Sequence, residues 1–214
     1  TNMSRLLFLS HKQKFYNSLV FVDNIKNKLD VFSNHNNIRY GDKKYIGIHY
    51  RDVISKYDEG DIKNNDVVNF TKNSPLDKFI EIIESVKDDN TEFILVSNSN
   101  DIYNKLVEKL PGKTFINSPS KSYDRNTSND MLESVVDFLI LSRCEIIIGS
   151  YFSSFSDEAS FFNFIPKITP LSNELTKDIT ATVQKYHCLN YSFIDGIAAL
   201  NYNDKIFIET LNLI

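Results

Sequence analysis

Short apolar runs that alternate with amphipathic segments constrain the fold of this chain more than any other feature of its sequence. The runs have the length and the β-branched or aromatic content of buried strands, and they span residues 44–50, 93–96, 114–116, 145–149 and 167–169. Between most of them, apolar residues recur every three or four positions, which is the periodicity of a helix with one buried face. The alternation predicts an α/β fold, an open parallel sheet of about five strands with helices on both faces.

The expected helices cover residues 14–32, 75–86, 101–110, 130–143 and a segment that starts within 150–156. Ser74 stands before a proline and is expected to cap the second helix, and Met131 is expected in the buried face of the fourth. Leu6–Leu9 fits a short strand or the end of an absent element. In the less regular tail, residues 171–189 are expected to be helical in part, and Lys205–Ile208 fits an edge strand or part of a helix.

Composition argues against a nucleic-acid-binding, membrane-spanning or disulfide-rich protein. A chain of 214 residues suits one α/β domain, or slightly more, and a net charge of −4 without a basic run argues against general nucleic-acid binding. No apolar run approaches the roughly 20 residues of a membrane span. Cys144 and Cys188 have no metal-ligand spacing and form no disulfide framework. A reduced core thiol at Cys144 is expected, which fits a reducing compartment such as the cytoplasm.

The first predicted strand ends in chemically useful residues, His49 and Arg51. Side-chain direction alternates along a strand, so both residues lie on the same face. At the carboxyl end of a parallel strand, that face borders the crevice where ligands bind in open α/β sheets. Arg51 would offer a fork of donors suited to phosphate, with His49 beside it. The alternative is a surface arginine next to a satisfied core histidine.

The fourth predicted strand ends at Gly149 in a turn rich in serine, Ser150–Ser156, which leads into a helix. Unpaired N–H groups and the helix dipole make such a terminus favourable for an anion. The alternative is ordinary N-capping by one of the serines. The chain has neither Gly-x-Gly-x-x-Gly nor Gly-Lys-[Ser/Thr], which argues against a dinucleotide dehydrogenase and a P-loop NTPase.

Two long polar loops complete the pattern. The first, from Asp52 to Asn73, holds Asp58, Glu59, Asp61 and Asp66, whose spacing does not match an EF-hand. A solvated acidic loop is therefore expected there, and no metal site is predicted. The second loop, residues 117–130, contains Arg125, which is expected to be structural or at the surface.

Four motifs in order give the chain a family resemblance. They are Gly47-Ile-His-Tyr-Arg51, Ser97-Asn-Ser-Asn-Asp101, Val135-Val-Asp-Phe-Leu-Ile-Leu-Ser142 and Ser153-Ser-Phe-Ser156. The stretch from Tyr45 to Ser160 resembles the fucosyltransferase-like glycosyltransferases, which include α1,6-fucosyltransferases, the nodulation fucosyltransferase and protein O-fucosyltransferases. The resemblance implies the C-terminal, donor-binding, Rossmann-like half of a GT-B fold. It also implies a GDP-sugar donor, usually GDP-fucose, and an inverting transfer that needs no metal or other cofactor.

The resemblance also implies roles for individual residues. Arg51 would be catalytic, holding the β-phosphate and stabilising the leaving diphosphate, while His49 lines the donor site. Asp137 would contact the guanine edge; the alternative is a helix carboxylate that faces solvent. Ser153, Ser154 and the N–H of Phe155 would contact phosphate.

The resemblance places residues 45–214 in the nucleotide-sugar domain and residues 1–44 in a helix and linker toward an acceptor-side half. A glycan or protein acceptor, and a missing acceptor-binding domain, would then be partners. Asp58, Glu59 and Asp61 are the candidates for a base that activates the acceptor. Two alternatives stay open: a non-catalytic nucleotide- or sugar-binding module of the same fold, and an unrelated flavodoxin-like phosphate-binding domain.

Overall fold

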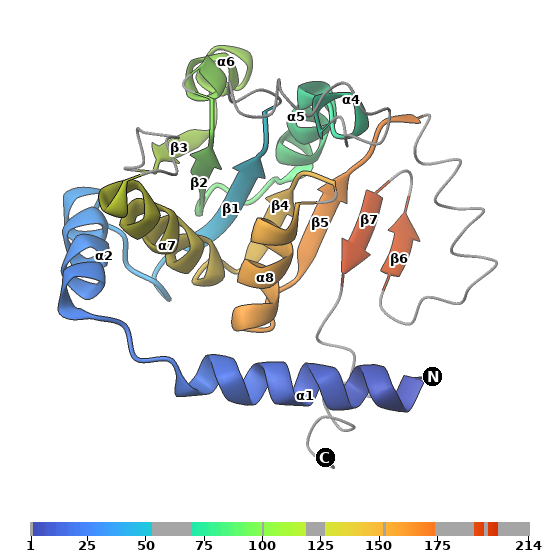
Figure 1. Cartoon of the computed structure of the whole chain (residues 1–214). Coiled ribbons are helices and arrows are strands. Elements are labelled where there is room, and N and C mark those ends of the chain that lie inside the picture. The colour runs from blue at the N-terminus through green and yellow to red at the C-terminus, as the bar shows by residue number, and fades with distance from the viewer. Residues whose placement is uncertain are drawn as a thin grey trace.

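The chain forms a Rossmann-like open sheet between two layers of helices (Figure 1). The computed structural model describes residues 2–52, 70–99, 101–118, 127–151, 153–173, 191–194 and 197–200. All five predicted strands are present: β1 Lys44–Tyr50, β2 Thr91–Ser97, β3 Thr114–Asn117, β4 Ile146–Gly149 and β5 Lys167–Pro170. They pair in parallel in the order β3-β2-β1-β4-β5, which confirms the predicted fold class.

An antiparallel hairpin that the sequence did not predict extends the sheet. Its strands are β6, Tyr191–Ile194, and β7, Ile197–Leu200, and β7 pairs with β5. The full order is therefore β3-β2-β1-β4-β5-β7-β6. Most of the segment 171–189, which was predicted to be helical in part, and all of Lys205–Ile208 lie outside the described residues.

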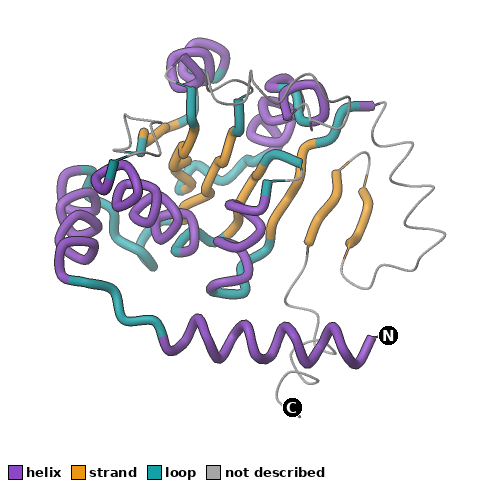
Figure 2. Tube along the Cα trace, in the orientation of Figure 1, coloured by secondary structure: helices purple, strands orange, loops and turns teal. Residues whose placement is uncertain are grey.

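The N-terminal region contains two helices where one was predicted. They are α1, Asn2–Ser18, and α2, Asp23–His35, separated by residues 19–22 with Val22 in an extended conformation (φ −65°, ψ 155°). Of the two alternatives for Leu6–Leu9, the short strand is wrong, because these residues lie within α1. The break lets α2 pack on the sheet through Ile25, Leu29 and Phe32 while α1 follows a different direction (Figure 2).

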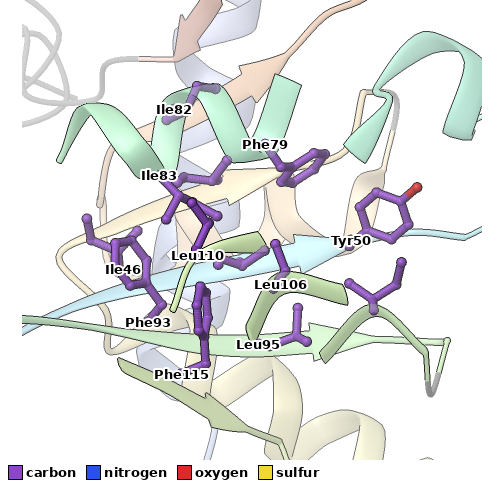
Figure 3. Packing of buried hydrophobic residues seen from close by; sticks show 13 residues of the cluster. Ile46, Tyr50, Phe79, Ile82, Ile83, Phe93, Leu95, Leu106, Leu110 and Phe115 are labelled. Carbon is purple, nitrogen blue, oxygen red and sulfur yellow. The ribbon is translucent and has the colours of Figure 1, made fainter. Parts of the chain in front are cut away.

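One face of the sheet is covered by α5, Leu76–Ser85, and α6, Asp101–Lys109, and the short helix α4, Phe70–Asn73, precedes α5. Phe79 and Ile83 of α5 point down onto Ile46 and Tyr50 of β1 (Figure 3). Phe79, Ile83 and Leu106 of α6 are fully buried. Burying side chains of this size is the main source of stability for such a layer, at about 1.5–3 kcal/mol each.

The opposite face is covered by α2, α7, Ser128–Ser142, and α8, Ser154–Phe162 (Figure 1). The Thr127 side chain caps α7 by accepting a hydrogen bond from the N–H of Asp130. Asp130 is buried in the first turn, and Met131 beside it is 54% exposed, so the prediction of a buried Met131 is wrong. Val136, Leu139 and Ile140 form the face of α7 that packs on the core, and the exposed Met131 lies outside that face.

Cys144 follows α7 as a free, buried cysteine, as predicted. Burial raises the pKa of its thiol, which keeps it protonated. Cys188 lies outside the described residues. None of the helices in the described ranges is long and apolar enough to cross a membrane. The proposed division of the chain at residue 44 stays a prediction.

Candidate functional site

The candidate site lies where the order of the sheet reverses. From β1 the chain continues outward to β2 and β3, whereas β4 and β5 extend the sheet on the other side of β1. Helices α5 and α8, which follow these two central strands, lie on opposite faces (Figure 1). In such a sheet a crevice opens between the carboxyl ends of the two strands. The residues that follow β1 and β4 therefore form the candidate site.

Ser150 joins the ends of these two strands. Its backbone N–H donates to the His49 carbonyl at 3.0 Å, and its Oγ accepts from the N–H of Arg51 at 2.9 Å. The side chain is fully buried, and a buried N–H left without an acceptor would cost about 1–3 kcal/mol. Ser150 therefore fixes the backbone on which the Arg51 side chain is carried.

Ser74 has a different role from the predicted one. The N-cap of α5 is Pro75, with no side-chain cap, so the prediction that Ser74 caps this helix is wrong. Its Oγ instead donates to the Pro170 carbonyl at 2.5 Å and accepts from the N–H of Tyr151 at 2.8 Å. Ser74 thus ties the end of β5 to the turn after β4.

Asn98, directly after β2, binds the segment that follows β1. Its Oδ1 accepts from the N–H of Asp52 at 2.7 Å, and its Nδ2 donates to the Asp52 carbonyl at 3.1 Å. The segments that follow β1 and β2 are therefore cross-linked. Sequence reasoning missed these roles of Ser74 and Asn98, because they depend on which strand ends meet in the sheet.

His49 is buried, with 6% of its surface exposed. Its Nδ1 lies 3.4 Å from Ser153 Oγ, and its ring centroid lies 5.1 Å from that of Phe155. Burial lowers its pKa from 6.5 to about 3, and the positive charges of Lys167 and Arg51 act in the same direction. The imidazole is therefore neutral at physiological pH, and it can serve an anion through a hydrogen bond but not through charge.

Arg51 supplies the positive charge at the end of β1. It is partly buried, directly after the strand, and near enough to His49 to disfavour protonation of the imidazole. The sequence left two interpretations of this strand end: an anion site, or a satisfied core histidine beside a surface arginine. The histidine is a buried, partnered residue, as in the alternative, whereas the arginine is more enclosed than a surface side chain.

The start of α8 carries no side-chain cap among the described residues. Ser153 occupies the N-cap position in an extended conformation, but its hydroxyl lies against His49 instead of the helix N–H groups. The hydroxyl of Ser156 donates to the Ser153 carbonyl at 3.2 Å. The alternative of simple capping by a serine is therefore wrong, and the first turn keeps the donor character expected of an anion-binding terminus.

The predicted residues at this turn lie in different surroundings. Ser154 is exposed, and Phe155 is partly buried between the rings of His49 and Phe138, 6.0 Å from the latter. The structure thus brings His49, Ser153 and Phe155 together, with Ser154 in the same turn.

Asp137 lies farther along the same edge of the sheet. It is buried on α7, and its carboxylate accepts a hydrogen bond from the hydroxyl of Ser118, the residue after β3. The alternative of a carboxylate that faces solvent is wrong. Asp137 therefore stands near the end of β3, on the far side of β2 from His49 and Arg51.

Lys167 is a residue that sequence reasoning missed. It is 2% exposed, at the first position of β5, and its ammonium pairs with Asp157 in α8. A single lysine at the start of a short strand gives no signal of burial in the sequence, because lysine is almost never fully buried.

Several predicted positions lie outside the described residues: Asp58, Glu59, Asp61, Asp66 and Arg125. Within the described ranges, no group of three or more His, Cys, Asp or Glu side chains could hold a metal ion.

Searches against family models and curated proteins returned no match. Solved structures of the NodZ α1,6-fucosyltransferase have a similar fold. The structure co-crystallised with GDP is 14% identical, over 69% of this chain and 44% of that chain, with a TM-score of 0.47. The structure soaked with GDP-fucose is 13% identical, over 72% of this chain and 46% of that chain, with a TM-score of 0.48. The selenomethionine structure from Bradyrhizobium is 12% identical, with a TM-score of 0.47. The chain spans less than half the length of these fucosyltransferases, and the likeness is one of fold.

Proposed function

We propose that this chain is the donor-binding part of a nucleotide-sugar glycosyltransferase, one half of a GT-B fold. The expected reaction transfers a sugar, with fucose as the first candidate, from a GDP-sugar to a glycan or protein acceptor. The observation that supports it is that Arg51 directly follows β1, two residues after the neutral His49, and that His49 contacts the start of α8, where Ser153 gives no side-chain cap.

The chemistry follows from the charge that develops during transfer. As the bond between the sugar and the diphosphate breaks, negative charge builds up on the leaving phosphate oxygens. A positioned guanidinium and backbone N–H groups stabilise that charge in the transition state. In this proposal Arg51 holds the β-phosphate, and Ser153, Ser154 and the N–H of Phe155 hold its oxygens. These donors do the work of a metal ion, so the proposed transfer requires none.

Base selection is assigned to Asp137. A carboxylate accepts the two parallel hydrogen bonds that guanine offers from N1–H and its amino group, and uracil does not offer this pair. The buried position of Asp137 and the hydrogen bond from Ser118 hold the carboxylate in one orientation. An inverting transfer also needs a base for the acceptor hydroxyl, for which Asp58, Glu59 and Asp61 stay the candidates.

A non-catalytic nucleotide- or sugar-binding module is the second candidate. The described residues that support the proposal all bind the leaving group, and binding of a diphosphate does not require transfer. This alternative predicts nucleotide binding without release of GDP from the donor, even with acceptor present.

Calorimetric titration with GDP and UDP, with and without magnesium, tests the proposal. We expect GDP to bind at least about tenfold more tightly than UDP, which corresponds to 1.4 kcal/mol, with no requirement for magnesium. Arg51→Ala should weaken GDP binding by about tenfold or more, because a charge-assisted hydrogen bond contributes about 1.5–3 kcal/mol. Arg143→Ala is the control, since Arg143 is exposed and precedes β4 at the opposite edge of the sheet.

Equal binding of GDP and UDP, or no binding of either, would refute the proposed donor specificity. Asp137→Asn distinguishes recognition of the guanine ring from recognition of the phosphates. It should reduce the preference for GDP over UDP and leave the affinity for pyrophosphate unchanged. Release of GDP from GDP-fucose in the presence of candidate acceptors then distinguishes a transferase from a binding module.

A further inference from the structure

The side chain of Lys167 runs along the face of the sheet that α8 covers, toward the carboxyl end of β4. Its backbone stands opposite Ile147 in the register of β4 and β5, two residues before Gly149. The stem nevertheless passes Gly149, because a Cβ on that glycine would lie 2.8 Å from Lys167 Cε. The ammonium then meets Asp157 in α8. The buried ammonium of Lys167 thus lies near the carboxyl end of β4.

The charge of Lys167 matters for phosphate binding because of its partner, Asp157. It is an acidic residue in the first turn of α8, and its side chain is 42% exposed. A carboxylate at a helix N-terminus is favoured by the helix dipole, and it therefore competes with an incoming phosphate for the same positive end. Unopposed, Asp157 would repel a diphosphate at this turn.

Lys167 removes that repulsion. The ammonium carries one positive charge and the carboxylate one negative charge, so the pair has no net charge. Burial of an unpaired lysine would be costly, and Asp157 provides the compensating partner. The two groups therefore neutralise each other at the first turn of α8, which the phosphates would approach.

We infer that Lys167 is a positioning residue of the anion site: by neutralising Asp157, it keeps the first turn of α8 attractive to the diphosphate of the donor. This inference rests on the proposed function and adds to it a residue that does not touch the ligand. It differs from a plain structural role, in which the ion pair only attaches α8 to β5.

A charge cycle distinguishes the two roles. The variants are Lys167→Met, Asp157→Asn and the double variant, and the ligands are inorganic pyrophosphate and GDP, titrated at one ionic strength. Lys167→Met should weaken binding of both ligands by about tenfold, because it leaves the negative charge of Asp157 without a compensating positive charge. Asp157→Asn should bind as tightly as the wild type or several-fold more tightly, and the double variant should return to within about threefold of the wild type.

A structural role predicts a different pattern. If the pair only attaches the helix, Asp157→Asn should weaken binding as Lys167→Met does, and the double variant should not recover. That pattern, or wild-type affinity in Lys167→Met, would overturn the inference. Lys44→Met is the matched control, because Lys44 pairs with Asp88 at 2.6 Å at the start of β1, the opposite edge of the sheet. Its affinity for both ligands should equal that of the wild type.

Two further outcomes separate this inference from the proposed function. If the chain binds pyrophosphate, GDP and UDP alike and the cycle holds, the inference stands and the GDP-sugar function fails. If GDP is preferred and the three variants bind as tightly as the wild type, the function stands and the inference fails. No binding of any ligand would refute both.

Lys167→Met could fail to fold, which loss of its cooperative unfolding transition would show. Asp157→Asn alone then decides, because weakened binding in that variant contradicts charge neutralisation.

Discussion

His49 makes the stability of this protein depend on pH in a way that can be calculated. Its pKa is about 3 in the folded chain, because of burial and the nearby charges of Lys167 and Arg51, against 6.5 for an ordinary histidine. Above pH 6.5 the imidazole is neutral in both states, so its stability contribution is fully present. Between pH 6.5 and 3 only the unfolded chain binds the proton, so stability falls as pH falls.

The size of the effect follows from the two pKa values. One pKa unit corresponds to 1.36 kcal/mol, and pH 5.0 lies about 1.5 units below the unfolded value. Lowering the pH from 7.5 to 5.0 should therefore remove about 2 kcal/mol of the free energy of unfolding through His49 alone. Glutamine at this position keeps a polar side chain of similar length that does not titrate. His49→Gln should thus lose about 2 kcal/mol less than the wild type over the same interval.

Urea unfolding at the two pH values, at constant ionic strength, measures this difference. His35→Gln controls for the loss of an imidazole, because His35 is exposed at the end of α2, and this variant should keep the pH dependence of the wild type. Equal pH-dependent losses in the wild type and His49→Gln would refute the reasoning. An NMR titration that finds His49 protonated near pH 6.5 in the folded chain would refute it as well.

Three further predictions concern the framework of the site, and urea unfolding measures each. Gly149→Ala should cost about 1–3 kcal/mol, because its Cβ would lie 2.6 Å from a serine Oγ and 2.8 Å from a lysine carbon; Gly112→Ala, where a Cβ meets nothing within 4 Å, should cost less than about 0.5 kcal/mol. Leu106→Ala should cost about 2–5 kcal/mol, since the side chain is fully buried, whereas the neighbouring Val107→Ala, at a position 41% exposed, should cost about 1 kcal/mol or less. Ser150→Ala should cost about 1–3 kcal/mol by leaving a buried backbone N–H without its acceptor.

The sheet could be predicted because its strands carry their own signals. Runs such as Phe93–Val96 and Ile146–Ile148 are apolar and β-branched or aromatic without interruption, as strands covered on both faces require. The break between α1 and α2 had no such signal, because the apolar spacing continues through residues 19–22. Its cause is tertiary: Tyr16 of α1 packs against Phe161 and Phe162 of α8, which holds α1 in a direction that α2 does not share.

The site was predictable to the extent that it follows from strand ends. The His-x-Arg pattern and the serine-rich turn place His49, Arg51 and Ser153 at one edge once the strands are recognised. The charge state of His49 was not predictable, since it depends on burial by a helix distant in sequence. The same holds for Lys167, whose burial depends on the register between β4 and β5.

The close approach of α8 to β4 explains why these features occur together. Gly149 has no side chain, and the space beside it holds Ser156 of α8 and the stem of Lys167. A larger residue would push the helix outward and separate Ser153 from His49, whose atoms lie 3.4 Å apart. The same displacement would expose the imidazole, raise its pKa toward 6.5 and lengthen the contact between Lys167 and Asp157. The neutrality of His49, the charge balance of Asp157 and the position of the α8 terminus therefore depend on one glycine. Gly149→Ala should thus weaken the proposed diphosphate binding together with stability, whereas Leu106→Ala should lower stability alone.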